Sequence, residues 1–205
     1  QAPPAPGEKC YGCGVYGDFG NDRREGDARV VRDGPRARAM TGGGRMAERP
    51  TVYIETTIPS FYFEVREDPT SRYHREATRR WWDHRSHGFL RVTSGFVLLE
   101  LEEAPDLIRG GAEALMRDVP LLPVPDRFDE VVATYIQHRV MPQDAQGDAA
   151  HLAVASLYAC EYLLTWNCRH LANARKTRHI EVVNRMMGLP SPLIVTPEGL
   201  MEDEP

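Results

Sequence analysis

The chain has 205 residues, of which 41% are hydrophobic and 27% charged, so it can form one globular domain with a sizeable core. No apolar run approaches the ~20 residues that a membrane-spanning helix needs, and no basic segment precedes an apolar stretch at the N-terminus. A cytoplasmic location is therefore expected. The formal net charge of −5 argues against binding nucleic acid through a broad basic surface, but it allows an acidic metal site with a basic rim.

Residues 1–50 differ in composition from the rest of the chain. They are rich in Gly, Pro, Arg and Asp and follow neither a strand period nor a helix period. We expect a disordered leader or an upstream extension; the alternative is an arm that binds a partner or nucleic acid. Cys10 and Cys13 form a C-x-x-C pair, but a zinc site needs further ligands at matching spacing, so reduced thiols are expected.

From Thr51 onward, short β-rich runs alternate with helical segments. Strands are predicted at 51–54, 89–93, 121–124, 161–165 and 192–195. Helices are predicted at 70–87, after Ser94 (whose hydroxyl could cap the helix), and at 104–118, 126–139, about 143–158 and 168–187. This alternation predicts an α/β fold with a central, mainly parallel sheet covered on both faces. The domain is placed at 51–200, with a short acidic tail at 201–205.

Polar residues follow three of the predicted strands. Glu55 follows the first strand, Ser94 the second and Asn167 the fourth. Ligands of open parallel sheets bind outside the carboxyl ends of the strands, so these residues are expected on one rim.

Acidic residues could form a metal site at this rim. Glu100 lies about a turn and a half beyond Ser94, and Asp148 lies in a helix of small residues. Asp144 precedes Asp148 by four positions and is given a supporting role, because two like charges on one helical face favour a nearby cation. Oxygen ligands favour Mg²⁺ or Mn²⁺ over zinc. The alternative for each acid is a solvated surface charge, and His151 is interpreted as a hydrogen-bonded helical histidine.

Phosphodiester hydrolysis fits such a site, because metal ions held by carboxylates activate water and neutralise charge on the phosphate. No Ser-His-Asp or Cys-His arrangement offers a comparable nucleophile. The segment after the first strand, residues 55–60, contains no glycine, which excludes most nucleotide-cofactor loops.

Three segments resemble the successive signatures of PIN domains, and they are closest to a VapC-like subgroup with "ETT-P-S" and "LLTWN-RHLAN" motifs. The segments are Val52–Ser60 (VYIETTIPS), Asp148–Ala155 (DAAHLAVA) and Leu163–Asn173 (LLTWNCRHLAN). The resemblance covers about residues 51–200 in the right order.

The resemblance implies a three-layer α/β/α fold, Mg²⁺- or Mn²⁺-dependent endonucleolytic cleavage of RNA, homodimers, and inhibition by a small antitoxin. It assigns catalytic roles to Glu55, Glu100, Asp148 and Asn167, of which the three acids would be metal ligands, and Thr56 would support the site. Two positions depart from the family pattern. The first acid is usually Asp rather than Glu, and the fourth is often Asp rather than Asn, which would weaken a hard-cation site.

Basic residues near the rim are candidates for RNA contact. They are Arg169, His170, Arg175, Lys176 and Arg178, which we expect on the helix leaving Asn167. The alternative is a solvated helix face. The three tryptophans could stack bases but are more typical of core or interface.

Three functions remain open from the sequence. The leading hypothesis is the ribonuclease toxin of a type II toxin–antitoxin pair. The second is a non-catalytic PIN-like module that binds RNA or protein on a degenerate metal site. The third is another metal-dependent phosphohydrolase, which is disfavoured because the first strand lacks a D-x-D arrangement.

Overall fold

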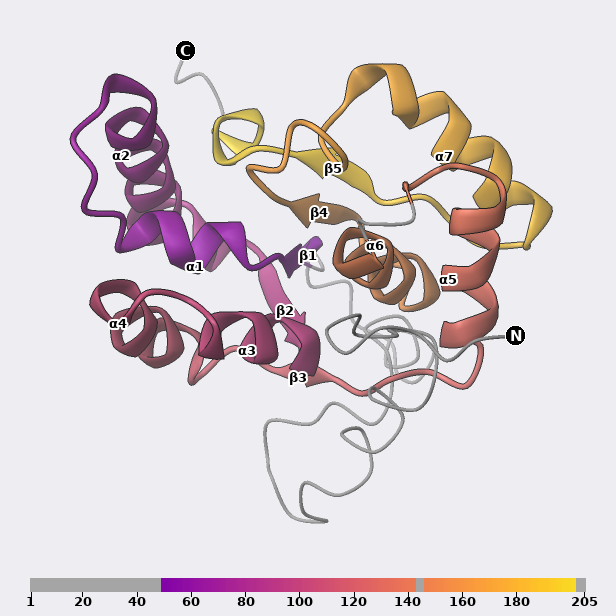
Figure 1. Ribbon diagram of the computed structural model, residues 1–205, viewed down its shortest axis with the longest axis horizontal. Coiled ribbons are helices and arrows are strands. Elements are labelled where there is room, and N and C mark those ends of the chain that lie inside the picture. The colour runs from indigo at the N-terminus through magenta and orange to yellow at the C-terminus, as the bar shows by residue number, and fades with distance from the viewer. Residues whose placement is uncertain (1–48, 143–145, 202–205) are drawn as a thin grey trace, which may run out of the picture.

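Five short strands in the described part of the chain pair into one all-parallel sheet of order β3-β2-β1-β4-β5 (Figure 1). The computed structural model describes residues 49–142 and 146–201. The strands are β1 (Thr51–Ile54), β2 (Leu90–Ser94), β3 (Leu121–Leu122), β4 (Tyr162–Leu164) and β5 (Leu193–Val195). The sequence therefore predicted all five.

Helices cover both faces of the sheet, as the alternation of segments predicted. They are α1 (Thr57–Tyr62), α2 (Pro69–His84), α3 (Gly95–Glu102), α4 (Asp106–Met116), α5 (Phe128–Gln137), α6 (Gln146–Leu157) and α7 (Ala174–Met186), with short 3₁₀ turns at η2 (Ser86–Gly88) and η3 (Pro197–Leu200). In Figure 1, α1, α2 and α4 lie on one side of the sheet, and α5, α6 and α7 lie on the other. The fold is a three-layer α/β/α arrangement.

Strand β1 lies at the centre of the sheet, and its side chains are buried on both faces. Val52, Tyr53 and Ile54 are fully buried, which is typical of a strand covered on both sides. Tyr53 pairs with Val92 of β2 and with Leu163 of β4. The segments that follow β1, β2 and β4 therefore meet at one edge of the sheet, as predicted.

Small side chains allow α6 to pack closely against the sheet. Ala149, Ala150, Ala153 and Ala155 are all buried. The three tryptophans also belong to the core, since Trp81, Trp82 and Trp166 are at most 9% exposed. These three indoles are therefore not free to stack on bases.

The prediction of one helix over 168–187 was wrong at its start. The amides of Leu171 and Ala172 both donate to the carbonyl of Asn167, which folds this segment into a turn. Helix α7 begins only at Ala174, where the Asn173 side chain accepts a hydrogen bond from the Arg175 amide at 3.1 Å. Residues 169 and 170 consequently lie in the turn and not on a helix.

Two other local predictions need correction. Ser94 occupies the N-cap position of α3, but its hydroxyl makes no capping hydrogen bond and instead lies 2.6 Å from the Tyr53 hydroxyl. Helix α1 was not predicted. Its Pro59 lies in the first turn, where a proline removes no hydrogen bond of the helix.

Several sequence-based expectations fall outside the described residues. These are residues 1–48 of the leader with Cys10 and Cys13, residues 143–145 with Asp144, and residues 202–205 of the tail.

The carbonyl of Pro50 accepts a hydrogen bond from the Leu90 amide at 2.9 Å, which ties this residue to the start of β2. Among the described helices, none combines the length and apolar character that crossing a bilayer requires.

Candidate functional site

Glu55 is a buried carboxylate at the carboxyl end of β1. Its amide continues the strand by donating to the Leu164 carbonyl at 3.2 Å, and the residue is only 4% exposed. The oxygen Oε2 accepts hydrogen bonds from the Thr57 amide (3.1 Å), the Thr57 hydroxyl (2.5 Å) and the Thr165 hydroxyl (2.8 Å). Within the described residues no group donates to Oε1, so one oxygen remains open to another partner.

Burial raises the pKa of Glu55, because a carboxylate is poorly solvated in the interior. The positive charge of His151 opposes this shift most strongly, followed by the hydrogen bonds from Thr57 and Thr165. The net pKa remains above its ordinary value. A further positive charge near Glu55 would therefore stabilise the ionised form.

Glu100 reaches the same region from α3. Its side chain is 41% exposed, and Oε2 accepts hydrogen bonds from the Thr56 hydroxyl and from His151 Nε2, the latter at 3.1 Å. Burial would raise the pKa of Glu100, but the charge and hydrogen bond of His151, with the hydrogen bond of Thr56, lower it overall. Thr56 thus contacts the site as predicted, through Glu100.

His151 is the member of this group that sequence analysis did not assign to the site. It is 1% exposed, with Nδ1 located 2.9 Å from the Tyr53 hydroxyl and Nε2 bonded to Glu100. Burial alone would lower the pKa of His151, but Glu100, Glu55 and Asp148 raise it to about 9. The expectation of a hydrogen-bonded helical histidine is confirmed, and its partner is one of the predicted ligands.

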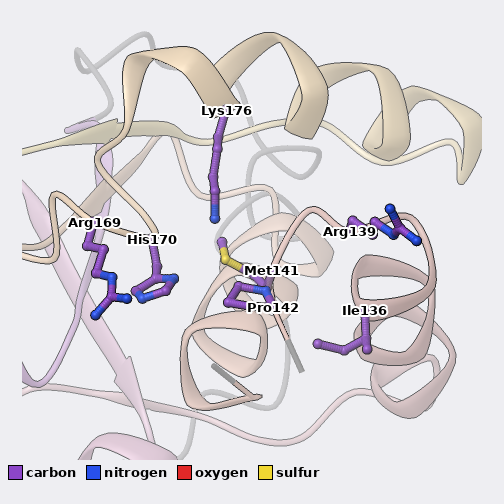
Figure 2. A pocket seen from close by; sticks show the side chains of 7 residues that line it. All are labelled: Ile136, Arg139, Met141, Pro142, Arg169, His170 and Lys176. Carbon is purple, nitrogen blue, oxygen red and sulfur yellow. The ribbon is translucent and has the colours of Figure 1, made fainter. Parts of the chain in front are cut away.

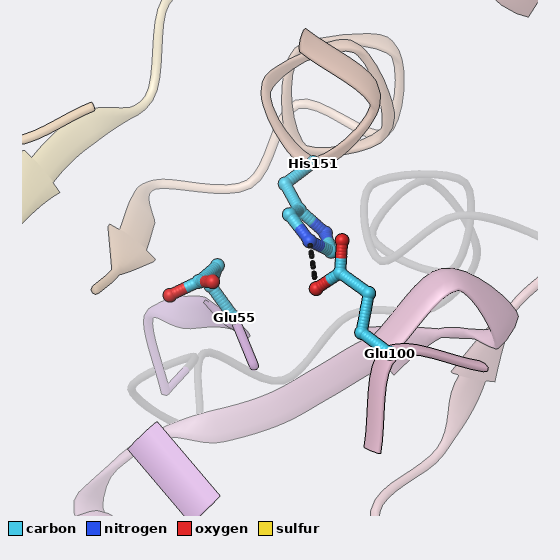
Figure 3. A group of neighbouring side chains, drawn as sticks. All are labelled: Glu55, Glu100 and His151. Atoms are coloured by element: carbon cyan, nitrogen blue, oxygen red, sulfur yellow. Dashed lines mark hydrogen bonds and ion pairs between the residues drawn. The ribbon is translucent and has the colours of Figure 1, made fainter. Parts of the chain in front are cut away.

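Glu55, Glu100 and His151 each bring a ligand atom to one point, and the three atoms lie within 4.8 Å of one another (Figure 3). They come from the end of β1, from α3 and from α6. Two carboxylate oxygens and an imidazole nitrogen are donors that a divalent cation accepts. The three residues could therefore hold a divalent metal ion.

Asp148 lies beside this group rather than within it. Its Oδ1 accepts a 2.8 Å hydrogen bond from the Asn167 side-chain amide. Burial raises the pKa of Asp148, and the nearby charge of Glu100 adds to that shift. His151 is the largest opposing influence. The predicted metal-ligand role of Asp148 and the catalytic role of Asn167 stay predictions, but the two side chains do meet at the expected rim.

Gly147 allows α6 to approach Glu100. A Cβ atom at this position would lie 2.7 Å from Glu100 Oε1, closer than van der Waals contact allows. The absence of a side chain at Gly147 thus leaves room for the Glu100 carboxylate beside α6.

The predicted basic residues separate into two sets. Arg169, His170 and Lys176 line a common pocket, whereas Arg175 and Arg178 are exposed on α7 and do not line it. His170 is connected to the acidic site, because its amide donates to Asn167 Oδ1 at 3.0 Å.

Comparisons of the chain with protein-family models, with curated proteins and with solved structures give no match.

Proposed function

We propose that this protein is a Mg²⁺- or Mn²⁺-dependent endoribonuclease that cleaves RNA phosphodiester bonds. The observation that carries the proposal is the convergence of Glu55, Glu100 and His151 at the carboxyl edge of a parallel sheet. Three segments far apart in the sequence place acidic and imidazole groups within 4.8 Å of one another. Two of these groups, Glu55 and Glu100, are the first and second acids expected from the PIN resemblance.

Glu55 and Glu100 would hold the ion, His151 would join them once its Nε2 has lost its proton, and Asp148 lies beside the group. A bound divalent ion supplies a Lewis acid that activates water and neutralises charge on the phosphate. The protein orients the carboxylates through threonine hydroxyls, with Thr57 and Thr165 on Glu55 and Thr56 on Glu100. Asn167 orients Asp148 in the same way.

Tyr53 and His151 support this arrangement from the interior. The Tyr53 hydroxyl contacts both Ser94 Oγ and His151 Nδ1, which fixes the imidazole ring with Nε2 toward Glu100. In the metal-free protein the protonated imidazole offsets part of the carboxylate charge. A cation bound to the same oxygens would take over that role.

The test is cleavage of a labelled structured RNA by the purified full chain with Mn²⁺, with Mg²⁺ and with EDTA. Metal-dependent cleavage is expected from the wild type and should be lost in Glu55→Gln and in Asp148→Asn. Glu102→Gln is the matched control, because it removes an exposed carboxylate from the end of the same helix as Glu100. Cleavage that persists in Glu55→Gln and Asp148→Asn would refute the proposal.

A non-catalytic module that binds RNA or protein is the second candidate. It is favoured by one observation, namely that each acid of the site already has a partner in the protein. Thr57 and Thr165 bind Glu55, Thr56 and His151 bind Glu100, and Asn167 binds Asp148. RNA binding without cleavage under any of the metal conditions would select this candidate.

The finer parts of the proposal concern the cellular setting. The resemblance to VapC-like proteins supports a toxin that acts as a homodimer in the cytoplasm and is blocked by an antitoxin. Induced expression should then arrest growth, and Glu55→Gln should abolish the arrest. Growth arrest that is equal for the wild type and Glu55→Gln would contradict the toxin role.

A further inference from the structure

A pocket of about 510 Å³ lies between the end of α5 and the segment that connects β4 to α7 (Figure 2). One side is formed by residues at and after the end of α5, namely Ile136, Arg139, the fully buried Met141 and Pro142, of which Ile136 and Pro142 expose apolar surface. Arg169, His170 and Lys176 line the pocket from the other side, and in Figure 2 the Lys176 side chain extends from α7 toward Met141 and Pro142. The pocket therefore combines an apolar surface with a cationic one.

The cationic wall has unused capacity for an anion. Neither Arg169 nor Lys176 forms an ion pair with any described residue. The atom Nδ1 of His170 is buried and has no hydrogen-bond partner within residues 49–142 and 146–201. Unpaired cations that share one concave surface attract an anionic ligand.

His170 also places the pocket next to the acidic site. Its amide binds Asn167, and Asn167 in turn binds Asp148. The imidazole is close enough to Asp148 to oppose the pKa rise that burial causes in that carboxyl. A ligand in the pocket would therefore lie on the side of the acidic site that carries Asp148.

We propose that this pocket binds one unpaired nucleotide of an RNA strand next to the bond that is cleaved, an inference that rests on the proposed ribonuclease function. The phosphate lies against Arg169 and Lys176, and the base lies against the apolar wall. The size suits this ligand, because pockets for small ligands span roughly 300–1,000 Å³. Bases of single-stranded RNA are free to leave the stack and occupy such a space.

The apolar wall distinguishes a nucleotide from a simple anion. Arg169 and Lys176 alone would serve inorganic phosphate or an acidic peptide equally well. The half-buried side chains of Ile136 and Pro142 add a surface that only a ligand with an apolar face can use. A nucleotide has such a face in its base, which the ribose separates from the phosphate.

The experiment measures binding to the full chain in EDTA, so that it is independent of cleavage. The probes are adenosine 5′-monophosphate, ribose 5-phosphate, inorganic phosphate and a hexaglutamate peptide, titrated by calorimetry. The nucleotide should bind about tenfold more tightly than ribose 5-phosphate because of the buried base. Lys176→Gln and Arg169→Gln should each weaken nucleotide binding about fivefold or more, as expected for lost charge-assisted phosphate contacts.

The matched control is Arg178→Gln, which removes the same charge from the exposed part of α7 outside the pocket. It should change nucleotide binding less than about twofold. Ile136→Ala should reduce the preference for the nucleotide over ribose 5-phosphate. Equal losses in Lys176→Gln and Arg178→Gln, no preference for the nucleotide over ribose 5-phosphate, or tighter binding of hexaglutamate would each overturn the proposal.

Failure of the pocket and failure of the nuclease function give different results. Glu55→Gln should bind the nucleotide as the wild type does and lose cleavage. Cleavage without nucleotide binding would refute the pocket and leave the nuclease function standing. Nucleotide binding without cleavage in the wild type would refute the nuclease function and show that the pocket serves a binding module.

Discussion

The Nε2 atom of His151 lies 3.1 Å from Oε2 of Glu100, and this pair joins α6 to α3 across the carboxyl edge of the sheet. Because the other ring nitrogen faces the Tyr53 hydroxyl at 2.9 Å, the imidazole is held from both sides. The pair links a core hydrogen-bond network to the acidic site, and several predictions depend on it.

The metal-free protein should lose stability as the pH rises through about 9. The pKa of His151 is raised to about 9 in the folded state, above the ~6.5 expected when unfolded. The contribution of His151 to the free energy of unfolding is therefore fully present below about pH 6.5. It is lost as the pH rises through about 9, and its size is on the order of 3 kcal/mol. Urea unfolding in EDTA between pH 6 and 10 measures it. His151→Gln should flatten this part of the profile, and an unchanged profile would contradict the assignment.

Mn²⁺ should raise the melting temperature through Glu55 and Glu100. An ion that binds only the folded state at a hundredfold excess over its Kd adds ~2.7 kcal/mol of stability. Thermal unfolding with and without Mn²⁺ should show this shift in the wild type and in the surface control Glu102→Gln. The shift should be largely absent in Glu55→Gln and Glu100→Gln. A full shift in either of these would place the ion elsewhere.

Gly147→Ala should impair metal binding more than it impairs folding. The new Cβ would lie 2.7 Å from Glu100 Oε1, so the carboxylate must move, while alanine favours the helix by up to ~1 kcal/mol. Gly110→Ala on α4 is the control, because its Cβ would meet nothing within 4 Å. Gly110→Ala should unfold at or above the wild-type temperature in EDTA, and only Gly147→Ala should need more Mn²⁺ for its stabilisation. Equal Mn²⁺ requirements in the two variants would refute the steric argument.

Asn167→Asp should make the metal-free protein less stable in EDTA and should strengthen cation binding. Asn167 donates to Asp148 through its amide, and an aspartate there would face Asp148 with a second negative charge. We expect a loss of ~1 kcal/mol in EDTA and a larger stabilisation by Mn²⁺ than in the wild type. Asn167→Ala, which removes the donor and adds no charge, separates the two effects. A Mn²⁺ response as large in Asn167→Ala as in Asn167→Asp would contradict the charge argument.

The rim of the site was predictable because it follows from topology. A buried β-rich run ending at Glu55 and a second ending at Asn167 fix which edge of a parallel sheet holds the polar residues. Glu100 was assigned to the site by the resemblance to PIN domains, because its distance from the second strand alone left a solvated surface charge as the alternative. The strand-end inferences use chain order and strand period, and both are readable from one sequence.

The inner geometry of the site was less accessible. Asp148 and His151 are three residues apart, so they lie on one face of α6 about 60° apart around the helix axis. Which of them meets Glu100 depends on the rotation of α6, and packing determines that rotation. The start of α7 was also out of reach. Residues 168–173 fold into a turn around Asn167 through backbone hydrogen bonds, and helix propensity does not predict these bonds.

The central position of β1 has a consequence for protein synthesis. Glu55 and Glu100 are translated early, but the strand that pairs with β1 on its other side and the helix that carries His151 emerge only after residue 145. A nascent chain that ends before α6 thus holds two acids without the imidazole that completes their cluster. Assembly of the acidic site therefore has to wait until the second half of the domain has left the ribosome.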